Sequence, residues 1–481
     1  MLALALAAAI VVGDGVALRA GPGRDSAQQA MLWRGDWLEV RGERRGWLKV
    51  YDHRHERPGW IALDNVRIQG LDEGNAAELR AIVGFLRDTP GAESLGIAYA
   101  ALYLRVAPAP AIGSDVLTAL GTMAERLARR ASGPADRKQD RAVAAHLEVA
   151  ESWGVHFVSV ERDDRARLCY DGEAFRYVLA LGTRAVGAPA AADDTARAVL
   201  ALSEPDCAPP GLGLAAQQAS DEARLALVEK VDPTAGTAWL GNRLRLRRAQ
   251  IASGLAWTRA RRGDREGAAR AAEAALASLL RVDRAELADD DGPVAAEAAV
   301  RVAASRWAAE RAPAAPAAGA PMLVTSPGRA GETCVAIAVA GARAPAPAPS
   351  PVRCSYGEVW AASFRAAPGG AAAAVAVQPL PGWLELWLLR RGSDGSWSVD
   401  VLPPATASPE LGYVELAGWS PDGARLLLVR QARVDGILQR SFEVVAVASL
   451  AVEHQSRRWA DLARYRRWAY ADWVKGALAL R

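Results

Sequence analysis

The sequence is poor in the residues that build most catalytic and metal centres. Its 481 residues include only five histidines, four cysteines and four methionines. It contains no GxSxG, HExxH or P-loop motif, no GxGxxG after a strand, no CxxC pair, and no histidine at metal-ligand spacing from a cysteine. We therefore predict that the protein is not an enzyme and has no catalytic residues, metal site or cofactor.

Lysine is equally scarce, because Lys49, Lys138, Lys230 and Lys475 are the only four in the chain. The formal net charge is +3, and arginines alternate with acidic residues in runs such as ERDDRAR and ARRGDREGAARAAE. Nucleic-acid binding requires a concentrated basic surface, and these mixed runs do not form one. We therefore predict no nucleic-acid partner.

The chain also lacks an apolar run long enough to span a bilayer. Its first residues, MLALALAAAIVVGDG, contain about a dozen apolar positions, which suits the core of an export signal but not a membrane span. We predict a signal segment at 1–9, a mature chain beginning near Ile10, and a location in the periplasm or cell envelope. No basic residue precedes the run, and the alternative is a buried first strand.

The four cysteines form two couples, each within one region of distinct composition. In an exported protein we predict disulfides Cys169–Cys207 and Cys334–Cys354. In a cytosolic protein the same residues would be four buried free thiols, so this prediction depends on the export signal.

Tryptophans and glycine turns punctuate the stretch at 10–68. It contains VALRAGPG, MLWRGDWLEV, RGWLKV and PGWIALDNV, in which short alternating strands are separated by tight turns. The order and spacing of these segments resemble the bacterial SH3 (SH3b) domain. The resemblance implies a small β-barrel, and a cell-wall glycopeptide or an envelope protein as its ligand. The charged tip YDHRHER at 51–57 is longer than the family's usual turn.

Trp33 and Trp37 flank the Arg34-Gly35 turn. Because Leu32, Leu38 and Val40 supply the inward face, strand alternation places both indoles outside, on the side of Glu39. One interpretation is that they dock on the next domain. The other makes them a ligand platform, with Arg34 and Tyr51 beside them.

From 75 to 310 the apolar residues recur every three or four positions, which predicts a mostly α-helical domain. The alternating segment VHFVSVERDDRARLCYDG predicts an inserted hairpin. Residues 249–281, with small Ala252, Ala256 and Ala268, resemble a tetratricopeptide-type helical hairpin. Only one copy is present, so an ordinary antiparallel helix pair remains an alternative.

The alanine- and proline-rich segment at 311–321 predicts a linker, and the residues at 322–481 have a β pattern. GWSPDGARLLLV at 418–429 resembles the blade motif of TolB-type, WD40-like β-propellers. The region is too short for a propeller, so we expect an antiparallel β domain of blade-like hairpins in an open sheet or sandwich. A terminal amphipathic helix should cover it with Trp459, Trp468 and Trp473.

The sequence thus predicts a multidomain α+β protein with an SH3-like barrel, a central helical domain and a C-terminal β domain. Three functions remain open. The first is a non-enzymatic envelope protein whose SH3b domain binds peptidoglycan or an envelope protein. The second is a periplasmic helical scaffold in which the barrel is a spacer. The third and least favoured is a divergent peptidoglycan hydrolase.

Overall fold

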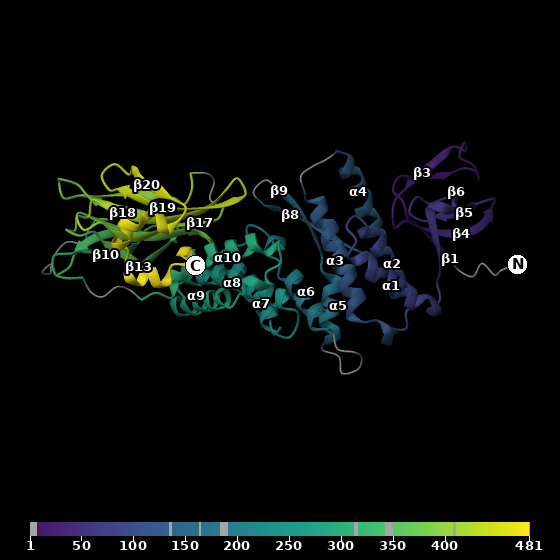
Figure 1. The fold of residues 1–481 in the computed structure, drawn as a ribbon, viewed down its shortest axis with the longest axis horizontal. Helices are drawn as coiled ribbons and strands as arrows, with labels where there is room; N and C mark the ends of the chain where they lie inside the picture. The colour runs from purple at the N-terminus through teal and green to yellow at the C-terminus, as the bar shows by residue number, and fades with distance from the viewer. Residues whose placement is uncertain are drawn as a thin grey trace. The chain divides into compact units, whose positions relative to one another are not determined.

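The structure, a computed structural model, describes residues 7–133, 137–162, 165–182, 191–311, 316–341, 350–406 and 410–480. It confirms a mixed α+β chain with an N-terminal sheet, a helical middle and a C-terminal group of strands (Figure 1). The chain divides into two compact units: Met1–Gly211 with Ala235–Thr237, and Leu212–Thr234 with Ala238–Arg481. This division lies inside the helical region predicted at 75–310, so the helices belong partly to each unit.

The N-terminal unit begins with a seven-stranded sheet in the order β3-β2-β6-β5-β4-β1-β7. Its paired strands are antiparallel, and the inward side chains Leu18, Leu32, Leu38, Val50 and Ile61 are fully buried. In the described part of the chain the edge strands β3 and β7 do not pair, so the sheet is not a closed barrel, and the predicted SH3-like barrel is not confirmed. The strands are β1 (Ala7–Val11), β2 (Val16–Arg19), β3 (Gln28–Leu32), β4 (Trp37–Arg44), β5 (Trp47–Asp52), β6 (Arg57–Ala62) and β7 (Val66–Gly70).

Strand β1 overlaps the segment predicted as an export signal, whose cleavage stays a prediction. It pairs with both β4 and β7, and Ala8, Ala9 and Ile10 are buried. Cleavage near Ile10 would remove Ala7, Ala8 and Ala9 from the strand that joins the edge strand β7 to β4. The alternative of a buried first strand therefore describes residues 7–11, although alanine has a low intrinsic preference for strands.

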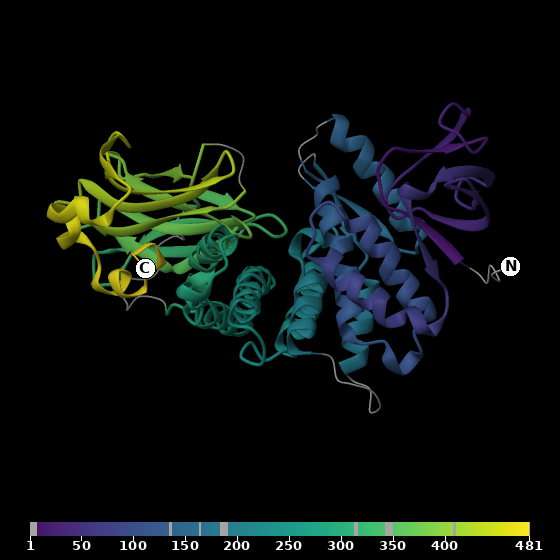
Figure 2. The ribbon, with the colours of Figure 1, turned by 45° about the vertical axis from the view of Figure 1, so that its right-hand side comes forward.

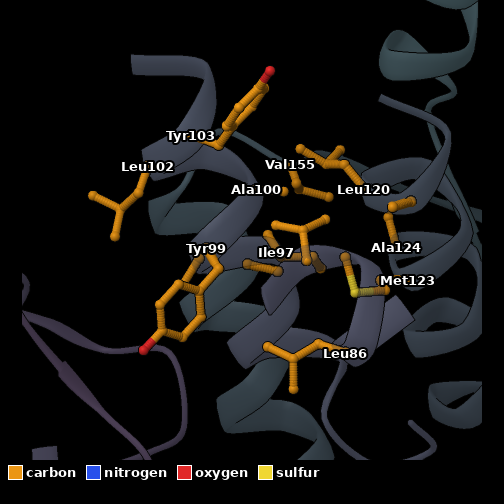
Figure 3. Packing of buried hydrophobic residues seen from close by; sticks show 14 of the residues in the cluster. Leu86, Ile97, Tyr99, Ala100, Leu102, Tyr103, Leu120, Met123, Ala124 and Val155 are labelled. Atoms are coloured by element: carbon orange, nitrogen blue, oxygen red, sulfur yellow. The ribbon is translucent and has the colours of Figure 1, made fainter. Parts of the chain in front are cut away.

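The described residues of the N-terminal unit also form six α-helices. Four of them lie where the apolar periodicity predicts, and the core between them includes Leu86, Ile97, Leu120 and Met123 (Figure 3). In Figure 3 the ring of Tyr99 points away from Met123, toward the N-terminal strands. The helices are α1 (Ala76–Arg87), α2 (Glu93–Val106), α3 (Ser114–Ala131), α4 (Arg137–Ser152), α5 (Glu173–Gly182) and α6 (Ala192–Leu202).

The predicted inserted hairpin is present as β8 (Phe157–Arg162) paired antiparallel with β9 (Arg165–Tyr170). Its second strand carries Cys169, which forms a disulfide with Cys207 after α6. The second disulfide joins Cys334 and Cys354, which face each other across two paired strands. The structure therefore contains the two bridges that the sequence predicts.

We expect non-reducing peptide mapping of the purified chain to recover these two bridges. Cys169 lies on the β8–β9 hairpin and meets Cys207 in the segment after α6. Cys334 and Cys354 are brought together by the direct pairing of their strands. Mass spectrometry of digests made after blocking free thiols would measure the pairing. Four alkylated cysteines, or a bridge from Cys169 to Cys334, would contradict the prediction.

The second unit contains α7 (Leu214–Glu229), α8 (Ala238–Arg261), α9 (Arg265–Leu280) and α10 (Asp291–Ser305). Helices α8 and α9 form the predicted antiparallel hairpin, with Ala252, Ala256 and Ala268 buried between them. Aspartates precede and begin α10, as acidic residues favour the positive end of a helix dipole. Figure 1 shows α8, α9 and α10 along one side of the C-terminal strands, and the turned view of Figure 2 shows the same arrangement.

The strands of the second unit form two sheets. An eight-stranded sheet has the order β13-β14-β15-β17-β18-β19-β20, with β16 also paired to β15, and a three-stranded sheet has the order β10-β11-β12. The prediction of purely antiparallel hairpins is wrong in one place, because β15 and β17 pair in parallel. The strands are β10 (Pro321–Pro327), β11 (Thr333–Val339), β12 (Arg353–Ser355), β13 (Glu358–Ala366), β14 (Ala372–Leu380), β15 (Trp383–Arg391), β16 (Trp397–Leu402), β17 (Gly412–Trp419), β18 (Arg425–Val434), β19 (Ile437–Ala446) and β20 (Val452–Ser456).

The SPDG segment forms the turn between β17 and β18, as its resemblance to a blade motif implies. The Ser420 hydroxyl lies 2.6 Å from an Asp422 carboxylate oxygen and accepts the Arg425 N–H at 2.9 Å. Gly423 has a φ of +69°, which is the left-handed conformation that glycine adopts without strain. The turn is therefore stabilised by its own side chains.

The chain ends in three short helical segments rather than one amphipathic helix. These are η7 (Trp459–Trp468), α11 (Ala471–Gly476) and η8 (Leu478–Leu480). Trp459, Trp468 and Trp473 nevertheless pack against the apolar cluster between the sheet and α10, as predicted. Most of the proline-rich segment at 342–352 and part of the linker at 311–321 lie outside the described residues.

Candidate functional site

The turn that carries Trp33 and Arg34 is built by Asp36. Its buried carboxylate accepts the Trp33 N–H at 2.8 Å, and its own N–H donates to the Trp33 carbonyl at 3.0 Å. Strand β1 holds the turn from below, because the Gly35 N–H donates to the Val11 carbonyl at 2.9 Å. Hydrogen bonds to Asp36 and to strand β1 thus fix the turn within the sheet itself, apart from its contacts with the helices.

Helices α2 and α4 contact this turn directly. The Ser94 hydroxyl donates to the Arg34 carbonyl at 2.8 Å, and the Trp153 indole N–H, just after α4, donates to the Gly35 carbonyl at 2.9 Å. A Cβ placed on Gly35 would lie 2.5 Å from the Ser94 carbonyl oxygen. The backbone of the sheet and the start of α2 therefore meet with no room for a side chain.

Asp14 connects the turn to α4, because its carboxylate contacts Arg34 of the turn and His146 of α4. Its carboxylate lies 3.2 Å from Arg34 Nε and 2.8 Å from Nε2 of the buried His146. Burial alone would raise the pKa of Asp14, but the hydrogen bond and charge of His146, with those of Arg34, lower it below its ordinary value. The folded unit thus favours the ionised carboxylate.

This shift gives a pH dependence of known sign. A carboxylate whose pKa is lower in the folded than in the unfolded chain stabilises the fold above its unfolded pKa near 3.8, and this stabilisation is lost as the pH falls through the folded value. We expect Asp14→Asn to lower the free energy of unfolding by about 1 kcal/mol at pH 6. Urea denaturation at pH 6 and in steps below pH 3.8 would measure the difference. A difference that grows as the pH falls would contradict this account.

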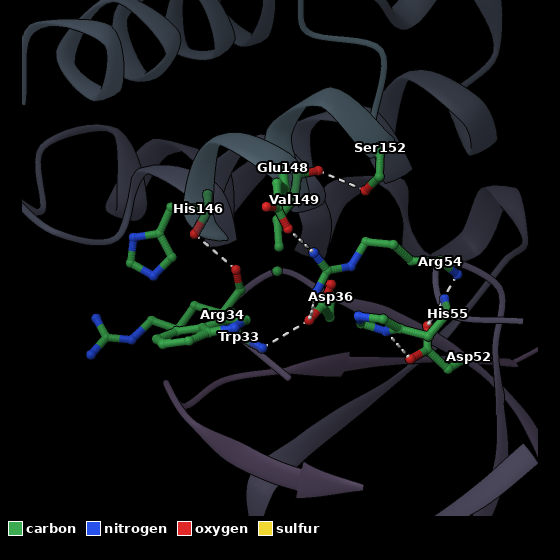
Figure 4. Close-up of polar contacts among 12 residues, drawn as sticks. Trp33, Arg34, Asp36, Asp52, Arg54, His55, His146, Glu148, Val149 and Ser152 are labelled. Carbon is green, nitrogen blue, oxygen red and sulfur yellow. Dashed lines mark hydrogen bonds and ion pairs between the residues drawn. The ribbon is translucent and has the colours of Figure 1, made fainter. Parts of the chain in front are cut away.

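Arg54 forms a second link between the sheet and α4 (Figure 4). Its guanidinium lies 3.0 Å from the buried Asp36 carboxylate and 3.1 Å from the Glu148 carboxylate on α4. Burial raises the pKa of Asp36, and the charge of Arg54 only partly offsets that effect. Arg54 therefore supports both the turn that carries Trp33 and the contact of that turn with the helices.

The two predicted platform tryptophans are half-buried against the helical part of their unit. The Trp33 ring meets the His146 ring edge-on at 6.3 Å, and the Trp37 ring lies 6.3 Å from that of Trp153. These contacts agree with the docking interpretation. Ligand binding by Trp33, Arg34 and Trp37 stays a prediction.

Tyr51 lies in a more open group on the same face of the sheet. It stands opposite Glu39 in the β4–β5 register, with the Arg41 guanidinium 4.2 Å from its ring centre and the His53 ring 4.9 Å away. His53 also stacks on Trp37 at 4.8 Å, and hydrogen bonds from Arg41 and His53 lower the pKa of Glu39. Arg41 and His53 are exposed, so these rings and charges border solvent.

The sequence patterns did not identify the residues that contact the Trp33–Gly35 turn or its neighbour Asp14. Asp14, Ser94 and Trp153 lie between 20 and 118 positions from their partners at 34 and 35, and His146 lies 132 positions from its partner Asp14. His55, in the charged tip at 51–57, pairs with Asp52 at 2.5 Å. Within the described ranges, no three His, Cys, Asp or Glu side chains gather as a metal site would require.

Two further observations bear on the nature of the protein. Among the described helices, none combines the length and the apolar character needed to cross a bilayer. No family model, curated protein or solved structure matches the chain. The geometry of the sheet and its helices is therefore the basis for inferring a function.

Proposed function

We propose that the protein is a non-enzymatic scaffold of the cell envelope, in which an SH3b-like sheet is a fixed support for the helices rather than a free ligand-binding module. The observation that carries this proposal is the docking of the Trp33–Gly35 turn on α2 and α4. A backbone approach without room for a Cβ is typical of a permanent interface. The two disulfides are compatible with an exported protein.

A second candidate function is favoured by the open group around Tyr51. A tyrosine ring beside an arginine and a histidine presents an apolar face with hydrogen-bond donors, which suits a sugar or a peptide of the cell wall. In this alternative the ligand platform consists of Tyr51, Arg41 and His53. Trp37 stacks on His53 and so holds that ring in place.

Replacing Trp33 and Trp37 together by alanine separates the two functions. If the rings serve docking, the double variant should melt about 5 °C lower, since about 2 kcal/mol of packing is lost in a unit of this size. Trp47→Ala is the matched control, because Trp47 is a half-buried indole of the same sheet that is not at the docked turn. Circular dichroism would follow the melting.

Sedimentation with purified peptidoglycan tests the second function on the same proteins. The scaffold proposal predicts that the wild-type chain stays in the supernatant. Pelleting that is abolished by Arg41→Ala with Tyr51→Ala, at an unchanged melting temperature, would overturn it in favour of wall binding. Unchanged melting of the Trp33/Trp37 variant would remove the docking role of these rings.

A further inference from the structure

The C-terminal unit contains a pocket of about 530 Å³ between its helices and its large sheet. The floor is formed by β17, β18 and β19, and the walls by α9, α10 and the segment between them, with Leu478 of η8 at one end. This volume lies within the range of pockets that hold small organic ligands. In Figure 1 α10 lies beside β17, and α9 lies on the far side of α10 from the strands.

The floor of the pocket is a row of three polar side chains. Tyr413, Gln431 and Arg440 are direct neighbours in the register of β17 with β18 and of β18 with β19, so they point to the same face of the sheet. The buried Tyr413 hydroxyl lies 3.3 Å from Gln431 Oε1. Burial raises the pKa of Tyr413, which keeps this hydroxyl protonated and able to donate.

The walls are almost wholly apolar. Leu279 and Leu280 come from the end of α9, and Val282 and Leu287 from the segment that follows it. On α10 the lining side chains include Ala296 and Ala299, whose small size leaves the space open. Leu280 is half exposed, at 51%, so an apolar surface borders solvent at this opening.

Both charged residues that line the pocket are arginines, Arg284 and Arg440. Arg440 uses one N–H to donate to the Ala479 carbonyl at 2.7 Å, and its guanidinium has five N–H groups in all. A carboxylate placed beside Arg440 would therefore find further donors there. The charge and the apolar walls together select an anion with a long apolar body.

We propose that this pocket binds a carboxylate with an unbranched alkyl chain, of the fatty-acid class. The carboxylate lies at Arg440 and Gln431, and the chain occupies the space between the leucines of α9 and the alanines of α10. This site is separate from the N-terminal sheet, so its test does not depend on the proposed scaffold function.

Calorimetric titration of the full chain with dodecanoate, below its micelle concentration, tests the proposal. Arg440→Gln should weaken dodecanoate binding about tenfold or more, as expected for the loss of a hydrogen bond to a charged group. Binding of dodecanol, which has the same chain without the charge, should change less than threefold. This comparison separates recognition of the carboxylate from a structural effect of Arg440.

Filling the pocket provides a second, independent variant. Ala296→Phe should abolish binding of both dodecanoate and dodecanol, because the phenyl ring would occupy the space of the alkyl chain. Val294→Phe is the matched control, since Val294 is on the same helix, 40% exposed and not in the lining, and binding should be unchanged. Melting curves would verify that each variant is folded.

Three results would overturn the proposal. The first is the absence of saturable dodecanoate binding to the wild-type chain. The second is equal binding by folded Ala296→Phe and Val294→Phe, which would place the ligand elsewhere. The third is an equal loss of dodecanoate and dodecanol binding in Arg440→Gln, which would remove the role of the carboxylate.

Discussion

Replacing Arg306 by methionine should lower the free energy of unfolding of the C-terminal unit by about 3 to 5 kcal/mol. Arg306 of η6 (Arg306–Ala308) is 8% exposed, and its Nε lies 2.8 Å from Oε1 of Glu415 on β17, which is 2% exposed. The Trp473 indole donates to the other carboxylate oxygen at 3.1 Å. Methionine keeps the apolar stem but leaves Glu415 buried without its cationic partner, which is the costly change.

The control for this prediction is Arg306→Met combined with Glu415→Gln. Glutamine is neutral and still accepts the hydrogen bond from the Trp473 indole. The free energy of unfolding of the double variant should therefore fall by only about 1 kcal/mol. Urea denaturation followed by hydrogen exchange of the β17 and β18 peptides would assign the change to this unit. Equal losses in the single and double variants would show that lost packing, not the unpaired carboxylate, determines the effect.

Replacing Gly35 by alanine should lower the free energy of unfolding of the N-terminal unit by about 3 kcal/mol. Gly35 has a φ of +90°, where an alanine costs about 1 to 2 kcal/mol. The added Cβ would also lie 2.5 Å from the Ser94 carbonyl and 3.1 Å from a Val149 methyl, and such overpacking costs about 1 to 3 kcal/mol.

Gly46→Ala is a closely matched control. Gly46 is in a turn of the same sheet with a φ of +79°, but a Cβ placed there meets nothing within 4 Å. Gly46→Ala should therefore lower the free energy of unfolding only by the cost of an alanine at positive φ, about 1 to 2 kcal/mol. The extra loss in Gly35→Ala measures the contact between sheet and helices. Equal losses in the two variants, by urea denaturation, would mean that the turn does not touch α2 in solution.

Local patterns predicted most of the secondary structure. The three- and four-residue spacing of apolar residues indicated α1 to α4, and Ser420 to Gly423 indicated the β17–β18 turn. Strand β1 was predicted only as the alternative to a signal segment, because its alanines lack the β-branched side chains that mark strands, and only pairing with β4 and β7 makes this segment a strand.

The division into two units and the candidate site depend on contacts between distant residues. Helices α6 and α7 both lie in the range predicted as helical, and a helical pattern does not identify the unit to which each belongs. Alternation placed Trp37 correctly outside the sheet core, but it does not identify what covers the ring. The ring is covered by His53 of the same sheet, 4.8 Å away, and by Trp153, which is over a hundred residues away in the chain and 6.3 Å from the ring.

In the scaffold that we propose, the face carrying Trp33 and Trp37 is covered by helices of its own chain. Hydroxyl-radical footprinting with mass spectrometry measures this directly, with each side chain's modification rate divided by its rate in the urea-unfolded chain. Phe85, which is 74% exposed on α1, gives the rate of an open aromatic ring. The docked turn predicts normalised rates for Trp33 and Trp37 several-fold below that of Phe85. Rates equal to that of Phe85 would show that the two rings are free, and would contradict the scaffold proposal.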